Sequence, residues 1–226
     1  MKKLTDYGDI QNIFTPSGNT LEILPTCNVP IDTLMQENWG LLYPYGNFRS
    51  VRSVETLVTG EHAGLFIKSP ERIFTNKSKI LSQGTVWWGG RRSGESSVRI
   101  NHPLVEEQTV WKALFLLELT FHDIPAERPQ AIVTYPTGHK ELIVKTIPLR
   151  DWNRNISTRG RSEQELKNDI LKLGFLPEDY GAHNCLTDQA GILRIIDVNR
   201  WSWPPYTDSF RNHLLQLVRS RIAESL

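Results

Sequence analysis

Short apolar runs separated by turn residues dominate the first two-thirds of the chain. Such runs are typical of β-strands, which are brief and commonly end at Gly, Pro, Asn or Asp. One longer run, over residues 103–119, has Pro103 in its first turn and predicts the main helix of this part. Strands are expected at residues 49–58, 63–68, 85–88, 97–100, 131–135 and 142–147.

A different pattern follows the last of these strands. Residues 150–161 are polar and basic, which predicts a loop. Residues 162–173 predict a helix, because Ser162 and Glu165 have the spacing of a capping box and Gly174 fits its C-terminal end. An almost wholly apolar strand is expected at residues 192–198, and a final helix at residues 209–223.

These elements together predict an α+β protein. With 226 residues, 39% of them hydrophobic and 23% charged, the chain is long enough to bury a sizeable core. Residues 1–147 are expected to form a β-rich lobe with an antiparallel sheet and one main helix. Residues 148–226 are expected to form a smaller, helical C-terminal lobe.

Composition narrows the class of partner and the compartment. The chain has 26 Lys and Arg against 25 Asp and Glu, so its formal charge of +1 gives no overall attraction to nucleic acid or membranes. No apolar run reaches the roughly 20 residues of a membrane span, and no apolar segment follows the first lysines as in a secretory signal. Cys27 and Cys185 lie far apart, so reduced thiols in a cytoplasmic protein are expected.

Three polar residues near the C-terminal end have a spacing that suggests chemistry. Asp179 and Asn184 lie five positions apart in an expected loop, and a short strand, a turn and a second strand then lead to Asp197. Taken singly, each is an ordinary turn or strand-end residue. Taken together, their carboxylate and amide oxygens suit a hard cation such as Mg²⁺, and a carboxylate beside a hydroxyl can accept its proton.

The order of these residues resembles the catalytic loop and metal-binding strand of the protein-kinase-like superfamily, which has Asp-x-x-x-x-Asn, a β-hairpin and a strand-end Asp. Ile-Ile-Asp-Val-Asn-Arg, at residues 195–200, is similar to the aminoglycoside- and lipopolysaccharide-type kinases. The resemblance implies a bilobal kinase-like fold that uses ATP and Mg²⁺. It also implies that Asp179 takes the proton of the acceptor hydroxyl, and that Asn184 and Asp197 are the metal ligands.

Upstream residues extend the resemblance in the order that the family requires. Leu-Phe-Ile-Lys, ending at Lys68, is similar to Val-Ala-Ile-Lys, whose lysine grips the α- and β-phosphates and pairs with a helix glutamate. Glu107 is the implied partner of Lys68, because it shares a helix face with Trp111 and Leu114.

Two further segments continue the resemblance. Residues 124–129, Ile-Pro-Ala-Glu-Arg-Pro, resemble the link that follows the helix in aminoglycoside and lipopolysaccharide kinases. The strand expected at residues 142–147 would lead into the hinge between the lobes, whose backbone holds adenine in this family. The resemblance therefore implies that Val144, Lys145 and Ile147 contact the nucleotide.

The leading hypothesis is an ATP- and Mg²⁺-dependent kinase. Because its C-terminal lobe is too small to dock an extended peptide, the expected acceptor is a hydroxyl of a small molecule or sugar, with a ribose of structured RNA next. The weak glycine loop at residues 40–46 and the Pro-Glu-Asp opening of the catalytic loop favour an alternative, a pseudokinase that serves as a nucleotide-binding or scaffold subunit. An unrelated α+β protein with a chance match is the third alternative.

Overall fold

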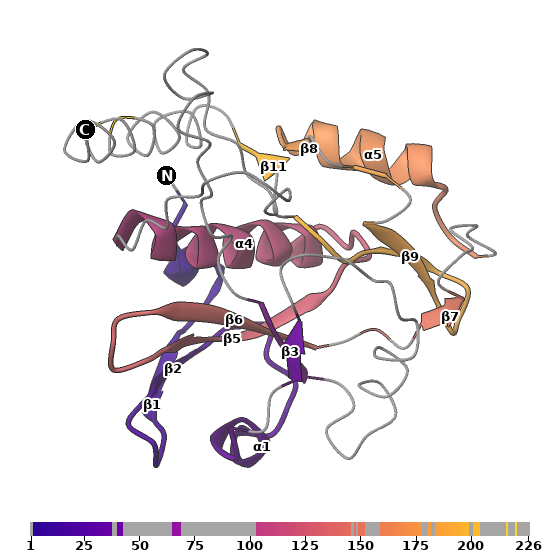
Figure 1. Cartoon of the computed structure of the whole chain (residues 1–226). Helices are drawn as coiled ribbons and strands as arrows, with labels where there is room; N and C mark the ends of the chain where they lie inside the picture. Colours follow the sequence, from indigo (N-terminus) through magenta and orange to yellow (C-terminus); the bar gives the residue numbers. More distant parts are fainter. Residues whose placement is uncertain are drawn as a thin grey trace, which may run out of the picture.

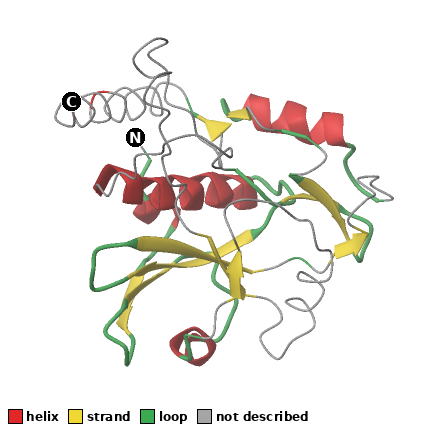
Figure 2. Ribbon diagram, viewed as in Figure 1, coloured by secondary structure: helices red, strands yellow, loops and turns green. Residues whose placement is uncertain are grey.

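The computed structural model describes residues 2–37, 40–42, 65–68, 103–145, 147, 149–151, 159–177, 180–181, 184–198, 201–203, 216 and 220. The described chain is a mixed α+β structure (Figures 1 and 2). It begins with a short 3₁₀ helix, η1 (Leu4–Tyr7).

A six-stranded sheet forms the larger part of the described fold. Every neighbouring pair in it is antiparallel except β3 and β4, which are parallel. In spatial order its strands are β1 (Gln11–Phe14), β2 (Thr20–Ile23), β5 (Arg128–Thr134), β6 (Lys140–Lys145), β4 (Leu65–Lys68) and β3 (Gly40–Leu42). The antiparallel sheet expected for the first part of the chain is therefore present.

The two faces of this sheet belong to two separate clusters of buried side chains. Because side chains alternate along a strand, Ile132 and Leu142 point to one face and Val133 and Ile143 to the other. Helix α4 (Pro103–Phe121) lies on the first face, and the short helix α1 (Ile31–Met35) lies on the second (Figure 1). Both central strands are consequently buried on both sides, with burial patterns unlike those of a half-exposed strand.

Helix α4 is the helix expected at residues 103–119, and it extends two residues further. Its buried side chains lie on all sides of the helix, so it packs against neighbours all round rather than along one stripe. The residues concerned are Gln108, Thr109, Trp111, Lys112, Ala113, Leu114, Phe115, Leu116, Leu117, Glu118 and Leu119. A helix with so many apolar side chains must be covered on both sides. The six-stranded sheet covers one side, and the C-terminal part of the chain covers the other.

The C-terminal part consists of one described helix and two small sheets. Helix α5 (Glu163–Lys172) begins at Ser162, whose hydroxyl accepts a hydrogen bond from the Glu165 amide, and ends beside Gly174 at φ 81°. The expected capping box is confirmed. The first sheet has the order β10 (Leu193–Ile195), β9 (Cys185–Asp188), β7 (Leu149–Asp151), and the second pairs β8 (Leu176–Pro177) with β11 (Trp201–Ser202).

Some expectations differ from the observed elements. The expected loop at residues 150–161 is wrong in part, because Arg150 and Asp151 belong to β7, which pairs with β9. The strand expected at residues 192–198 is shorter, and the β1–β2 hairpin was not expected at all. The strands predicted at 49–58, 85–88 and 97–100 lie outside the described residues, as does most of the helix at 209–223.

A continuous apolar core joins the two parts of the chain. Side chains of α4, β5 and β6 pack in one cluster with Leu166, Phe175, Leu193 and Trp201 from the C-terminal part. Phe115 of α4 contacts Phe175 edge-on, with ring centroids 5.0 Å apart. Among the described helices, none is long and apolar enough to span a membrane.

Candidate functional site

Lys68 ends β4 and points to the α4 side of the sheet. Leu65 and Ile67 of the same strand contribute to the cluster on the α1 side of the sheet. Because side chains alternate along a strand, Lys68 lies on the other face. The ammonium group forms an ion pair with the carboxylate of Glu127 and donates a hydrogen bond to the backbone carbonyl of Ile196. Lys68 therefore links the large sheet to the segment that immediately precedes Asp197.

Glu127 is a buried carboxylate just before β5. Its side chain is only 6% exposed, and its backbone amide donates a hydrogen bond of 2.9 Å to the carbonyl of Ile195. Burial raises the pKa of Glu127 to about 7, and the charge of Asp197 acts in the same direction, whereas Lys68 and Lys112 oppose the rise. The pKa of Glu127 therefore depends on charges from three elements: Lys68 of β4, Lys112 of α4 and Asp197 after the β9–β10 hairpin.

Asn184 and Asp197 lie at the open end of that hairpin. The Ile196 amide donates a hydrogen bond of 2.9 Å to the Asn184 carbonyl, so the residue before Asp197 is held beside Asn184. Asn184 is buried and Asp197 is half-buried. Because Lys68 binds the Ile196 carbonyl, the structure brings Lys68, Asn184 and Asp197 to one place.

The other end of the hairpin is fixed by Asp188. Its two carboxylate oxygens accept hydrogen bonds from the Ile192 amide at 2.9 Å and from Arg194 Nε at 2.6 Å. Although burial of Asp188 acts in the opposite direction, these donors hold the pKa of its carboxyl below the usual range. Gly191, at φ 80°, provides the left-handed turn that this short connection needs. The hairpin that carries Asp197 is therefore braced at both ends.

The expected pairing of Lys68 with Glu107 is wrong in this structure. Glu107 is exposed in the first turns of α4, and Lys68 pairs instead with Glu127 from the link after that helix. The neighbouring Glu106 accepts a hydrogen bond of 2.6 Å from the Lys140 amide, which ties this end of the helix to the β5–β6 turn. The buried position beside Lys68 is occupied by a carboxylate from the link between α4 and β5.

The remaining expected site residues fall into three groups. Asp179, the expected base, lies outside the described residues. Val144 is fully buried in the core on the α4 side of the sheet, so its side chain is not available to a ligand. Lys145 and Ile147 both line a pocket beside the β9–β10 hairpin. Their contact with adenine stays a prediction.

Two residues of this cluster were not among the expected site residues. Lys112 is 4% exposed on α4 and contributes to the electrostatic environment of Glu127. Its sequence signal is a lysine inside the apolar run Val-Trp-Lys-Ala-Leu, where a charge is unusual unless it is paired. Glu127 gives no such signal, because Arg, Pro and Gln follow it directly in the sequence.

The donor atoms present suit magnesium held together with phosphates. Within the described part of the chain, no three His, Cys, Asp or Glu side chains gather as a metal site. Mg²⁺, however, is usually held by one or two protein oxygens, with substrate phosphates and water completing its shell. Asn184 and Asp197 fit that smaller requirement.

Comparison of the chain with known family models and with curated proteins gave no significant match. The function is therefore inferred from the side chains of the site and their surroundings.

Proposed function

We propose that this protein is an ATP- and Mg²⁺-dependent phosphotransferase with a bilobal, protein-kinase-like fold. The observation that supports this most strongly is the position of Lys68. Its ammonium group lies between the Glu127 carboxylate and the Ile196 carbonyl, one residue before Asp197 and beside Asn184. A strand lysine that binds the residue before a carboxylate from a second sheet's hairpin suits a phosphate chain with a bound cation.

Each group has a distinct task in this proposal. Lys68 binds phosphate oxygens of ATP, and Glu127 holds its side chain in place through the ion pair. Asn184 and Asp197 hold Mg²⁺, which neutralises charge on the phosphates. Asp179 orients the acceptor hydroxyl and takes its proton, which requires no covalent intermediate on the protein.

The first test is the thermal stability of the purified protein with ATP, with and without Mg²⁺. A ligand that binds only the folded state raises the melting temperature, so ATP with Mg²⁺ is expected to raise it. The variant Asp197→Ala should lose the Mg²⁺-dependent part of the rise. The matched control is Asp32→Ala, which removes an exposed carboxylate of α1 and should respond like the wild type.

The possible outcomes of this test are distinct. Loss of the rise in Asp197→Ala but not in Asp32→Ala supports the proposed metal ligand. An unchanged rise in both variants would mean that the nucleotide binds elsewhere. If saturating ATP has no effect on the wild type, the kinase proposal is wrong.

The acceptor in this proposal is a hydroxyl of a small molecule or sugar, with a ribose of structured RNA as the next choice. Only about thirty residues separate Ile147 from Asp179, which leaves little surface for an extended peptide. Consumption of ATP with panels of sugars, aminoglycosides and short RNA hairpins would identify the class. The variant Asp179→Ala should bind ATP like the wild type and transfer no phosphate.

A second candidate is a nucleotide-binding subunit that does not transfer phosphate. The observation in its favour is the altered lysine partner: Glu107 of α4 is exposed, and the same helix carries the buried cation Lys112. Nucleotide binding that is equal in the wild type and in Asp179→Ala, with no turnover on any acceptor, would favour this candidate.

A further inference from the structure

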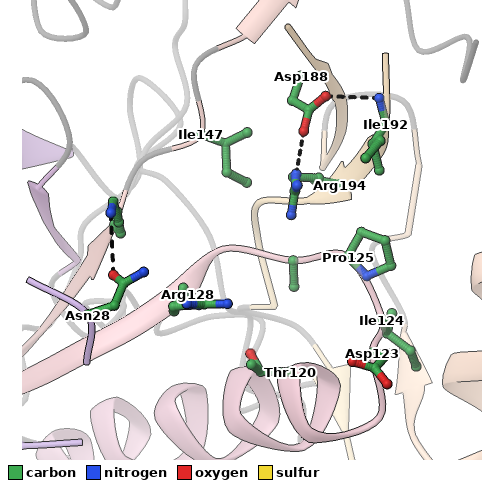
Figure 3. Close-up of a pocket in the computed structure, with 12 residues that line it drawn as sticks. Asn28, Thr120, Asp123, Ile124, Pro125, Arg128, Ile147, Asp188, Ile192 and Arg194 are labelled. Carbon is green, nitrogen blue, oxygen red and sulfur yellow. Dashed lines mark hydrogen bonds and ion pairs between the residues drawn. The ribbon is translucent and has the colours of Figure 1, made fainter. Parts of the chain in front are cut away.

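A pocket of about 450 Å³ lies where the end of α4, the start of β5, the end of β6 and the β9–β10 hairpin meet (Figure 3). This volume lies within the usual range for small-molecule sites. Part of its wall is apolar, formed by Ile124, Pro125, Ala126, Ile147 and Ile192. A ring or other flat apolar group could pack on this wall.

The charges around the pocket are predominantly basic. Arg128, Lys145 and Arg194 line it, against the two carboxylates Asp123 and Asp188. Asp188 is already engaged by Arg194 Nε and by a backbone amide, so its charge is largely offset. Figure 3 shows Arg128 between the Asp188–Arg194 pair and Thr120, while Asp123 lies apart from it near the end of α4.

All three of these cations have N–H groups left to donate to a ligand. Within the part of the chain that the structure describes, the guanidinium group of Arg128 forms no hydrogen bond or ion pair. Lys145 has one long contact, 3.4 Å from its Nζ to Asn28 Oδ1. Arg194 uses its Nε on Asp188, and a guanidinium group has further N–H donors beyond that one.

The pocket is separate from the cluster around Lys68. Arg128 and Lys145 are direct partners in the β5–β6 ladder, so their side chains share one face of the sheet. Glu127, the residue before Arg128, turns to the other side and pairs with Lys68. Residues 126–128 therefore separate the pocket, which Arg128 and Lys145 line, from the cluster that contains Lys68 and Glu127.

We infer that this pocket is a second ligand site, which binds a small phosphate ester through Arg128, Lys145 and Arg194. Arginine matches phosphate well, because its planar N–H groups can form two parallel charge-assisted hydrogen bonds. The apolar wall then holds the organic part of the ester. This assignment does not depend on the proposed kinase activity, and it concerns the side chains of Lys145 and Ile147, whereas the adenine contact expected of the hinge is made by the backbone.

The test uses phenyl phosphate as the probe and isothermal titration calorimetry on the full-length protein. Its ring suits the apolar wall and its phosphate suits the cations. The variants Arg128→Gln and Lys145→Gln should each weaken binding about tenfold, since a hydrogen bond to a charged group typically contributes that much. The control Lys167→Gln removes a charge from the exposed face of α5, outside the pocket, and should bind like the wild type.

A further variant, Lys68→Met, distinguishes this site from the proposed nucleotide site. Unchanged phenyl phosphate affinity in Lys68→Met, together with weakening in both pocket variants, supports the inference. Weakening in Lys68→Met alone would place the probe at the Lys68 cluster and overturn it. Equal weakening in Lys167→Gln, or no heat of binding to the wild type at millimolar probe, would overturn it as well.

Discussion

Replacing Glu127 by Gln tests the electrostatics of the cluster directly. Burial raises the pKa of this carboxyl from 4.5 to about 7 in the folded protein. The folded state then holds the proton more tightly than the unfolded chain, so Glu127 favours folding at low pH. That contribution is lost as the pH rises from about 4.5 to about 7.

The effect of Glu127 on stability can be calculated from the difference between its pKa in the unfolded and folded states. A shift of one pKa unit corresponds to about 1.4 kcal/mol, so the raised pKa of Glu127 lowers the free energy of unfolding, relative to a side chain that stays neutral, by about 3 kcal/mol at pH 8 and by about 1 kcal/mol at pH 5. Gln has nearly the same shape and stays neutral. Glu127→Gln should therefore be more stable than the wild type by these amounts, with the larger gain at pH 8.

Urea unfolding followed by tryptophan fluorescence at pH 5 and pH 8 measures both differences, since the chain has seven tryptophans. Glu107→Gln is the control: it alters an exposed carboxylate and should change the unfolding free energy by less than about 0.5 kcal/mol at either pH. If Glu127→Gln equals the wild type at pH 8, or if its advantage shrinks from pH 5 to pH 8, the reasoning is refuted.

Three further predictions concern the parts that hold the site in place. His139 lies 3.1 Å from Glu106 and 3.3 Å from Glu141, and the hydrogen bond to Glu141 leads the contacts that raise its pKa. His139→Gln should therefore destabilise the protein below about pH 6.5 and have no such effect once the raised pKa is exceeded, as thermal melts at pH 6 and pH 9 would reveal. Ser162→Ala should cost about 1 kcal/mol in urea unfolding, because it removes the N-cap of α5; a loss under about 0.3 kcal/mol would contradict this. Gly174→Ala should lower the free energy of unfolding by about 1 kcal/mol, because Gly174 has a φ of 81° and alanine is strained in that conformation. A urea midpoint equal to or higher than that of the wild type would contradict this left-handed conformation.

Local signals in the sequence predicted the elements that depend on local interactions. Helix α5 was located because Ser162, Glu165 and Gly174 act within a few residues of one another. Helix α4 was located because its apolar run is long and unbroken. By contrast, β1 has only one half-buried apolar side chain, Ile13, and its place at the sheet edge is determined by pairing with β2.

The candidate site was predictable only in part for the same reason. Lys68 ends β4, and Asn184 and Asp197 lie within two residues of β9 and β10. The resemblance to the protein-kinase-like superfamily implied that they would lie close together. Helix periodicity indicates Glu107 as the partner of Lys68, and this prediction is wrong because the tertiary fold brings in a carboxylate from beyond the helix. No local pattern distinguishes Glu127 from Glu107 as that partner, since the choice depends on which of them is buried beside β4.

The burial of α4 on all sides affects how the protein unfolds. The helix lies between the six-stranded sheet and the C-terminal part of the chain (Figure 1). Aromatic side chains of that part, including Phe175 and Trp201, belong to the same buried cluster as the helix. Separation of the two parts would expose much of this helix to water, so we expect them to unfold as one cooperative unit. Amide hydrogens in the middle of α4 should then exchange only through global unfolding, whereas those of the outer strand β1 should exchange through local fraying.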